Sequence, residues 1–200
     1  MHIILKALLP CLLLATVQVQ AVEYNQVQLK QSMLNFGYRQ MGVPMDGKFG
    51  KFAADVSFDP ARLVGAHARI DVDLASIDTG SEEVDDGVTG KLWFNTGQYP
   101  LASFVSSGVK ALGGNRYQAT GHLTIKGKTL EVTAPVTFQT SGNQASFDGS
   151  FNIKRLDYAI GTGEWTDLGT VANDIQIRFH LVVYAAPASP SSTQPPRKKP

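Results

Sequence analysis

The sequence is poor in the features that commonly carry metal binding, nucleic-acid recognition or catalysis. It has one cysteine, Cys11, which excludes an internal disulfide, a thiolate zinc finger and a cysteine-ligated iron–sulfur cluster. Its 18 basic and 17 acidic residues nearly balance, whereas a general nucleic-acid binder needs a basic face to neutralise phosphates. It contains no G-x-S-x-G motif, no phosphate-binding glycine loop and no haem-attachment motif. Nucleic-acid binding is therefore excluded, and no motif points to an enzyme.

The first 21 residues have the layout of a secretory signal peptide. Lys6 gives a weakly positive start, an apolar run extends from Ala7 to Val17, and Val19 and Ala21 occupy the −3 and −1 positions of a cleavage site. The apolar run is too short to span a bilayer comfortably. We expect cleavage after Ala21 and export to a bacterial periplasm. The rival interpretation is lipidation at Cys11, which the preceding proline and the short apolar stretch before it disfavour.

Residues 185–200 form a tail that is rich in proline and serine, and we expect it to be disordered. Three basic residues, Arg197, Lys198 and Lys199, stand near its end. We expect them to be solvated. The alternative is a weak, transient attraction to anionic lipid headgroups at a membrane surface.

The segment between these two ends, residues 22–184, reads as consecutive β-strands. Apolar and polar residues alternate with the two-residue period of a half-buried strand. The clearest stretches are Ala66–Leu74, Ala119–Ile125, Leu130–Phe138, Phe147–Ile153 and Ile175–Val183. Turn residues separate them, and Gly127 predicts a tight hairpin over residues 125–130. One short helix is predicted after Ser81, which we expect to cap it, with Val84 and Val88 on one face.

This pattern predicts an all-β fold: an antiparallel, eight-stranded, lipocalin-like barrel with one short helix. Strands and helices do not alternate, so a parallel sheet is unsupported. A closed barrel has no unpaired edge, and glycines within strands, such as Gly65, Gly121 and Gly149, favour the bending that closure needs. A two-sheet sandwich fits the alternation nearly as well.

The interior of such a barrel is either filled by side chains or open to a ligand. Small inward residues, such as Ala66, Ala68 and Gly121, leave volume near the axis, and aromatic rings surround it with an almost charge-free wall that suits a long apolar molecule. The alternative is a packed core in which small residues oppose large ones. The predicted cavity residues are Phe36, Ala66, Ala68, Ile70, Trp93, Phe94, Phe104, Leu123, Phe138, Phe147, Phe151 and Phe179.

A series of short segments resembles the YceI-like family of exported, lipocalin-like, polyisoprenoid-binding proteins. No single piece is specific, but their order and spacing together are. In order, the pieces are Phe36, Gly42, Gly47 and Phe49; Asp73–Thr79; Leu92–Asn95; Tyr99 and Pro100; Phe104–Ser106; Gly121–Gly127; and Phe151–Tyr158 with Gly161. The resemblance implies a barrel over residues 22–184 with a hydrophobic tunnel for an isoprenoid chain, such as a quinone tail or a polyprenyl lipid. It supplies no catalytic residue. The acidic segment after Thr79 departs from the common family pattern.

The polar candidates are few. His67, His122 and His180 fall on the polar faces of their strands, so we expect them to face solvent and predict no metal site. Arg39, Arg155 and Trp165 are the candidate headgroup contacts, because an arginine at a barrel rim can pair with a phosphate or donate to a quinone oxygen. The alternative for the arginines is a surface ion pair with an aspartate such as Asp157.

We therefore predict an exported protein that holds an isoprenoid lipid or quinone for transport, storage or sequestration, with no required cofactor and no enzymatic activity. Two alternatives stay open. One is a filled barrel that acts through its outer surface as a stress-response or interaction module. The other is an enzyme on an isoprenoid substrate, which needs a polar trio at the cavity mouth.

Overall fold

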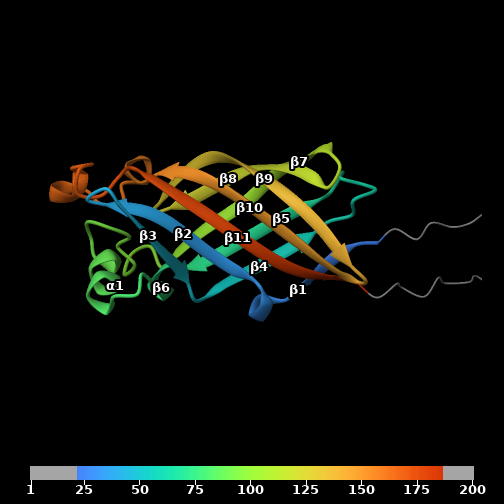
Figure 1. The fold of residues 1–200 in the computed structure, drawn as a ribbon, viewed down its shortest axis with the longest axis horizontal. Helices are drawn as coiled ribbons and strands as arrows, with labels where there is room; N and C mark the ends of the chain where they lie inside the picture. Colours follow the sequence, from blue (N-terminus) through green and yellow to red (C-terminus); the bar gives the residue numbers. More distant parts are fainter. Residues whose placement is uncertain (1–21, 187–200) are drawn as a thin grey trace, which may run out of the picture.

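The structure is a computed structural model that describes residues 22–186 (Figure 1). The predicted signal peptide and the end of the predicted tail lie outside the described residues. The strands are β1 (Tyr24–Val27), β2 (Met33–Gln40), β3 (Val43–Phe49), β4 (Phe52–Ser57), β5 (His67–Asp73), β6 (Ile77–Asp78), β7 (Leu101–Gly113), β8 (Arg116–Ile125), β9 (Lys128–Ser141), β10 (Gln144–Lys154) and β11 (Asp174–Ala185). The helices are α1 (Glu82–Thr89) and four short 3₁₀ helices, η1 (Leu29–Gln31), η2 (Leu74–Ser76), η3 (Arg155–Tyr158) and η4 (Gly163–Thr166). None of the helices in this part of the chain has the length and hydrophobicity to cross a bilayer.

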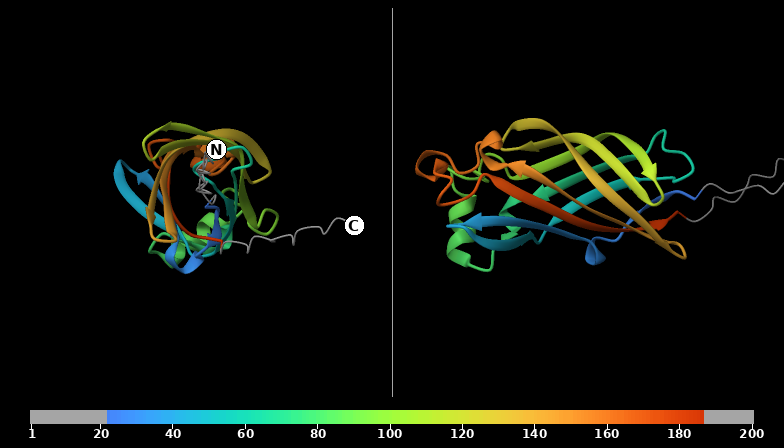
Figure 2. Two further views of the ribbon diagram at one scale, coloured as in Figure 1. Left: turned by 90° about the vertical axis from the view of Figure 1, so that its right-hand side faces the viewer. Right: turned by 45° about the horizontal axis from the view of Figure 1, so that its top comes forward.

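The strands curl into one antiparallel barrel, elongated along its axis (Figure 2). The hydrogen-bonded order is β4-β5-β7-β8-β9-β10-β11-β2-β3-β6, and β1 also pairs with β11. Tyr24 of β1 and Phe58 just after β4 exchange two main-chain hydrogen bonds, of 2.9 and 3.1 Å, which link the two sides of the curl. The all-β, antiparallel, lipocalin-like barrel class is confirmed.

The predicted number of eight strands is wrong, because the described residues form eleven. Long runs of the wall are interrupted where the chain bends. β1 and β2 both pair with β11 and are separated by η1, while β3 and β4 are separated only by residues 50 and 51. Each interruption shifts the alternation by one residue. Val27 and Leu34 both face inward, as do Phe49 and Phe52, although an odd number of positions separates the two members of each pair.

The predicted hairpin and helix are both present. Lys126 and Gly127, with φ of 50° and 73°, connect β8 to β9, and both left-handed values fit a primed turn. Helix α1 begins at Glu82, directly after Ser81. The predicted side-chain cap is wrong: the Ser81 hydroxyl makes no capping bond, and its main-chain carbonyl accepts the Asp85 N–H at 2.9 Å instead.

Three glycines of the wall lie beneath aromatic rings of neighbouring strands. A Cβ atom added at Gly47, Gly121 or Gly149 would come closer than 3.0 Å to a phenylalanine ring. The rings are those of Phe36, Phe104 and Phe179. The space directly over Gly121 and Gly149 is therefore occupied by a ring, and the open volume lies farther in, near the axis.

Candidate ligand-binding cavity

The barrel encloses an elongated cavity of about 610 Å³. Its wall is almost entirely apolar and receives side chains from β2, β5, β7, β8, β10 and β11. At one end the wall includes Val84 and Val88 of α1 together with Trp165 of η4. Glu83, an exposed residue of α1, also lines the cavity, so the cavity reaches solvent at this end, which we call the mouth.

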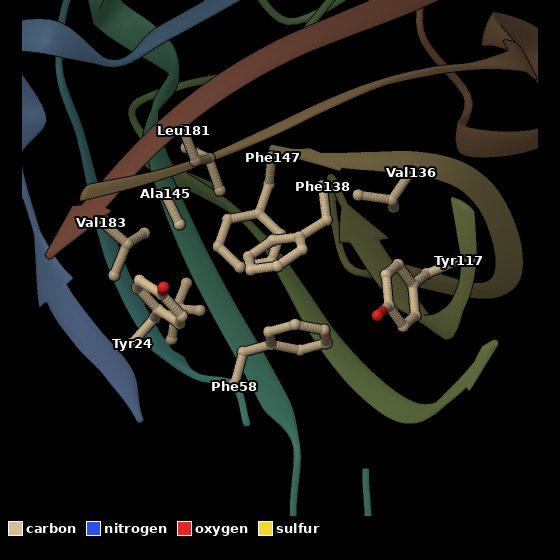
Figure 3. Close-up of a cluster of buried hydrophobic side chains, with 10 residues drawn as sticks. Tyr24, Phe58, Tyr117, Val136, Phe138, Ala145, Phe147, Leu181 and Val183 are labelled. Carbon is tan, nitrogen blue, oxygen red and sulfur yellow. The ribbon is translucent and has the colours of Figure 1, made fainter. Parts of the chain in front are cut away.

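The opposite end is closed by a cluster of aromatic rings, which we call the plug (Figure 3). Phe58 lies at its centre, with ring centroids 4.9 Å from Phe138, 5.1 Å from Phe147 and 5.1 Å from Tyr117. The Tyr24 ring packs edge-on against Phe138 at 5.5 Å. Such edge-to-face contacts stabilise a rigid apolar cluster. The plug therefore bounds the cavity at the end opposite the mouth.

The structure places all but one of the predicted cavity residues on the wall. Phe138 is the exception: it is buried in the plug and does not line the cavity. The residues that line it are Phe36, Ala66, Ala68, Ile70, Trp93, Phe94, Phe104, Leu123, Phe147, Phe151 and Phe179. Ligand binding by these side chains stays a prediction, but the alternative of a barrel filled by its own side chains does not match this interior.

Arg155 lies near the mouth. It is not an exposed residue of the rim, and it forms no ion pair with Asp157. Its side chain is only 1% exposed. All five guanidinium N–H groups donate to main-chain carbonyls at 2.6–3.1 Å, and the acceptors are Ile160, Gly161, Trp165, Val171 and Ala172. Burial lowers the pKa of this guanidinium from its usual value. The prediction that Arg155 hydrogen-bonds to a headgroup is therefore wrong, because all of its N–H groups already donate to carbonyls of the protein.

The other two headgroup candidates have different surroundings. Arg39 is exposed, does not line the cavity, and donates to the Gly42 carbonyl at 3.1 Å, so its predicted pairing with Asp157 is not observed. Trp165 does line the cavity, with its ring centroid 5.4 Å from that of Trp93. The Arg155 guanidinium carbon lies 5.6 Å from the Trp93 ring centroid, a cation–π distance.

Sequence reasoning missed the polar residues of the mouth. Tyr38 and Gln40 of β2 line the cavity, as do Thr79 after β6 and Glu83 of α1. Burial raises the pKa of the Tyr38 hydroxyl, and the nearby Asp85 carboxylate raises it further. The signal was present, because Leu34, Phe36, Tyr38 and Gln40 alternate in β2, so inward Phe36 implies inward Tyr38 and Gln40.

The histidines do not converge. His180 contacts the Asp148 carboxylate at 2.6 Å across β10 and β11, His67 lies 3.7 Å from Asp55, and His122 is exposed on β8. Between residues 22 and 186, histidine and acidic side chains form no group that could hold a metal ion. The predictions that the protein needs no metal and no cofactor stay predictions.

Comparison with known proteins gives consistent similarities. Among solved structures, BcnA of Burkholderia cenocepacia is 47% identical, with a TM-score of 0.77 over 78% of this chain and 99% of that chain. A UPF0312 protein of Azotobacter vinelandii is 27% identical over 173 residues, covering 82% of this chain and 88% of its own length. A polyisoprenoid binding domain of Saccharophagus degradans, 18% identical, shares the fold with a TM-score of 0.61 over 84% of this chain and all of its own.

The family model described as "YceI-like domain" matches residues 25–183, which is nearly all of the chain that the structure describes. The match includes all of β2 to β10, most of β11 and the helix at the mouth. It confirms the resemblance that the order of the short segments indicated. The chain belongs to the YceI-like domain family.

Proposed function

We propose that the protein is an exported carrier that holds one isoprenoid chain, of a quinone or a polyprenyl lipid, for transport, storage or sequestration. The observation that carries this proposal is the apolar tunnel with a polar mouth. An apolar wall favours an apolar chain because it offers no partner to a buried polar group. The polar mouth leaves a place for a headgroup at the point where the tunnel meets solvent. The domain of Saccharophagus degradans described as polyisoprenoid-binding shares this fold.

The size of the tunnel suits this role. Its volume of about 610 Å³ lies within the usual range for small-molecule sites. Removing roughly 500 Å² of lipid tail from water at about 25 cal/mol per Å² contributes on the order of 12 kcal/mol. Association and ordering costs remove about half of that, which leaves on the order of 6 kcal/mol, or binding in the range of roughly tens of micromolar. The apolar tunnel therefore suffices without a metal, a cofactor or a covalent bond, and we propose that none is required.

The test is mass spectrometry of the mature protein purified without detergent, under native conditions and after organic extraction. We expect a co-purifying or readily loaded prenyl chain at one per barrel. The matched variants are Ala68→Phe, which puts a ring into the tunnel, and Ala68→Ser, which does not. Ala68→Phe should reduce uptake far more than it reduces thermal stability. A protein that never retains or takes up a prenyl chain contradicts the proposal, as does equal loss of uptake and stability in Ala68→Phe.

Export is the second part of this proposal and rests on the signal-peptide pattern of residues 1–21. The experiment is fractionation of the native bacterium followed by determination of the mature N-terminus. We expect a periplasmic chain that begins at Val22. A cytoplasmic chain that retains its first residues would contradict export and leave the binding proposal unaffected.

A further inference from the structure

We propose that the mouth selects a neutral, hydrogen-bonding headgroup, such as an alcohol or a quinol, over an anionic diphosphate. This inference rests on the proposed function and specifies the ligand class for the same tunnel. It follows from three features of the mouth: uncommitted polar side chains, a cation without free donors, and an excess of carboxylates.

The first feature is hydrogen-bonding capacity that the protein does not use. The side chains of Tyr38, Gln40 and Glu83 line the cavity, and none of them hydrogen-bonds to another group within residues 22–186. Tyr38 offers a hydroxyl donor, Gln40 offers both a donor and an acceptor, and Glu83 offers an acceptor. A headgroup that both donates and accepts can satisfy all three side chains at once. A fully ionised diphosphate presents acceptors only and cannot donate to Glu83.

The second feature is the state of the cation at the mouth. Arg155 is the only lysine or arginine on the cavity wall of the described chain. Its N–H groups are all donated to main-chain carbonyls, so an entering phosphate finds no hydrogen bond from it. His67 is the other basic residue on the wall, but its neighbours Ala66 and Ala68 pack against the plug, at the far end of the tunnel. An arginine or lysine recognises a phosphate through free N–H donors, and Arg155 has none.

The third feature is the charge of α1. Its sequence Glu82-Glu83-Val84-Asp85-Asp86 carries four carboxylates, and Val84 from the same turn lies on the cavity wall. Asp85 is held at the mouth because its carboxylate accepts the Thr79 main-chain N–H at 2.8 Å and the Thr79 hydroxyl at 2.7 Å. These carboxylates repel an anionic headgroup.

Three other cations in this region are already engaged by groups of the protein, and one of them, Lys48, lies 3.2 Å from the Asp78 carboxylate. Lys126 donates to the carbonyls of Lys91 and Ala159 at 3.0 and 2.8 Å, and Arg39 donates to the Gly42 carbonyl. Neither of these two side chains lines the cavity. An anionic headgroup at the mouth therefore meets the Glu83 carboxylate on the wall, whereas Arg155, the one lysine or arginine that lines the cavity of the described residues, has no free N–H to offer it.

The experiment compares geranylgeraniol with geranylgeranyl diphosphate, which share one chain and differ only in the headgroup. Delipidated mature protein is titrated with each compound below its aggregation concentration, and the fluorescence of Trp93 and Trp165 on the cavity wall reports occupancy. We expect the alcohol to bind at least about tenfold more tightly than the diphosphate. Equal binding, or tighter binding of the diphosphate, would overturn the inference. Failure of both compounds to bind would remove the proposed function itself.

Two variants locate the selectivity at the mouth. Glu83→Lys should reduce or reverse the preference, because it replaces a wall carboxylate by a free ammonium. Glu82→Lys makes the same change of charge on a residue of the same turn that does not line the cavity, and it should leave most of the preference intact. Tyr38→Phe should weaken binding of the alcohol by about twofold to tenfold, because the headgroup loses a hydroxyl donor. An equal effect of both lysine variants would refute the assignment to Glu83.

Discussion

Replacing the buried arginine tests how the mouth of the barrel is held together. The Arg155 guanidinium joins main-chain carbonyls from the turn after η3, from η4 and from the segment before β11. Its hydrogen bonds to Ile160, Gly161 and Val171 are fully buried. Two further bonds, to Trp165 and Ala172, are partly buried. In Arg155→Met the apolar stem persists while these carbonyls lose their donor.

The expected loss follows from the burial of these five bonds. At about 1 kcal/mol for each buried carbonyl and about half of that for each partly buried one, the free energy of unfolding falls by about 4 kcal/mol. Arg155→Met also removes a charge that folding would otherwise take out of water, and this offsets part of the loss. We therefore expect a net decrease in the free energy of unfolding of about 3 kcal/mol. Arg155→Lys keeps the charge and supplies three N–H donors, and we expect roughly half the decrease.

The assay is urea unfolding followed by tryptophan fluorescence, with far-ultraviolet circular dichroism as a second probe. With a slope of about 1–3 kcal/mol per molar urea, Arg155→Met should lower the midpoint by at least about 1 M. The control is Arg178→Met, which removes a partly exposed arginine paired with Asp46 and should cost less than about 1 kcal/mol. If Arg155→Met costs no more than this control, the carbonyls do not depend on the guanidinium and the reasoning fails.

Three further predictions concern the wall and the rim. Gly149→Ala should lower the free energy of unfolding, measured with heat or urea, by about 1–3 kcal/mol, because the added Cβ meets a ring and a main-chain oxygen. The control is Gly108→Ala, which has open space at the added Cβ and should leave the free energy of unfolding almost unchanged. Hydrogen bonds from the Gly169 N–H and the Thr170 hydroxyl hold the pKa of Asp167 below its usual value. The ionised Asp167 carboxylate therefore stabilises the loop fully at pH values above the pKa of Asp167 in the unfolded chain. This stabilisation is lost as the pH falls through the pKa of Asp167 in the folded protein. A carboxyl titration by NMR checks this, and an Asp167 midpoint at or above that of a free aspartate contradicts it. Met41→Glu and Leu168→Glu should slow the transfer of a prenyl chain from neutral vesicles to the protein without changing the equilibrium affinity. The reason is that Met41 and Leu168, which are 74% and 50% exposed, lie on loops beside the mouth. An unchanged transfer rate would rule out membrane contact at this end.

The class of fold was predictable because it depends on a local and repetitive signal. Alternation along Ala119–Ile125 and Ile175–Val183 assigns each side chain to one face of its strand, and closure follows from the need to pair every edge. The number of strands was not predictable from that signal. The interruption at η1 is a bend in the main chain that β11 spans on the partner side. The alternation shifts by one residue between Val27 and Leu34, and this stretch is too short to define the two strands on either side of the shift.

The site was predictable where it is apolar and not where it is polar. Phe36, Phe104 and Phe179 were identified as cavity residues because an inward aromatic ring can be inferred from alternation alone. The role of Arg155 could not be inferred, since its acceptors are carbonyls up to 17 residues away, brought together by two 3₁₀ helices. Phe138 shows the complementary limit: alternation shows that it faces inward, but not whether it lies in the tunnel or in the plug that closes it.

The glycines of the wall explain how a barrel so rich in aromatic residues keeps an open axis. Phe36, Phe104 and Phe179 each lie over a glycine, on Gly47, Gly121 and Gly149 respectively, and all three rings line the tunnel. A side chain at the glycine position would push the ring away from the sheet and toward the axis. The glycines therefore maintain the tunnel indirectly, by letting large rings lie flat against the wall. Gly149→Ala should then lower ligand capacity together with stability, which distinguishes it from Ala68→Phe, a change that fills the tunnel while leaving the wall intact.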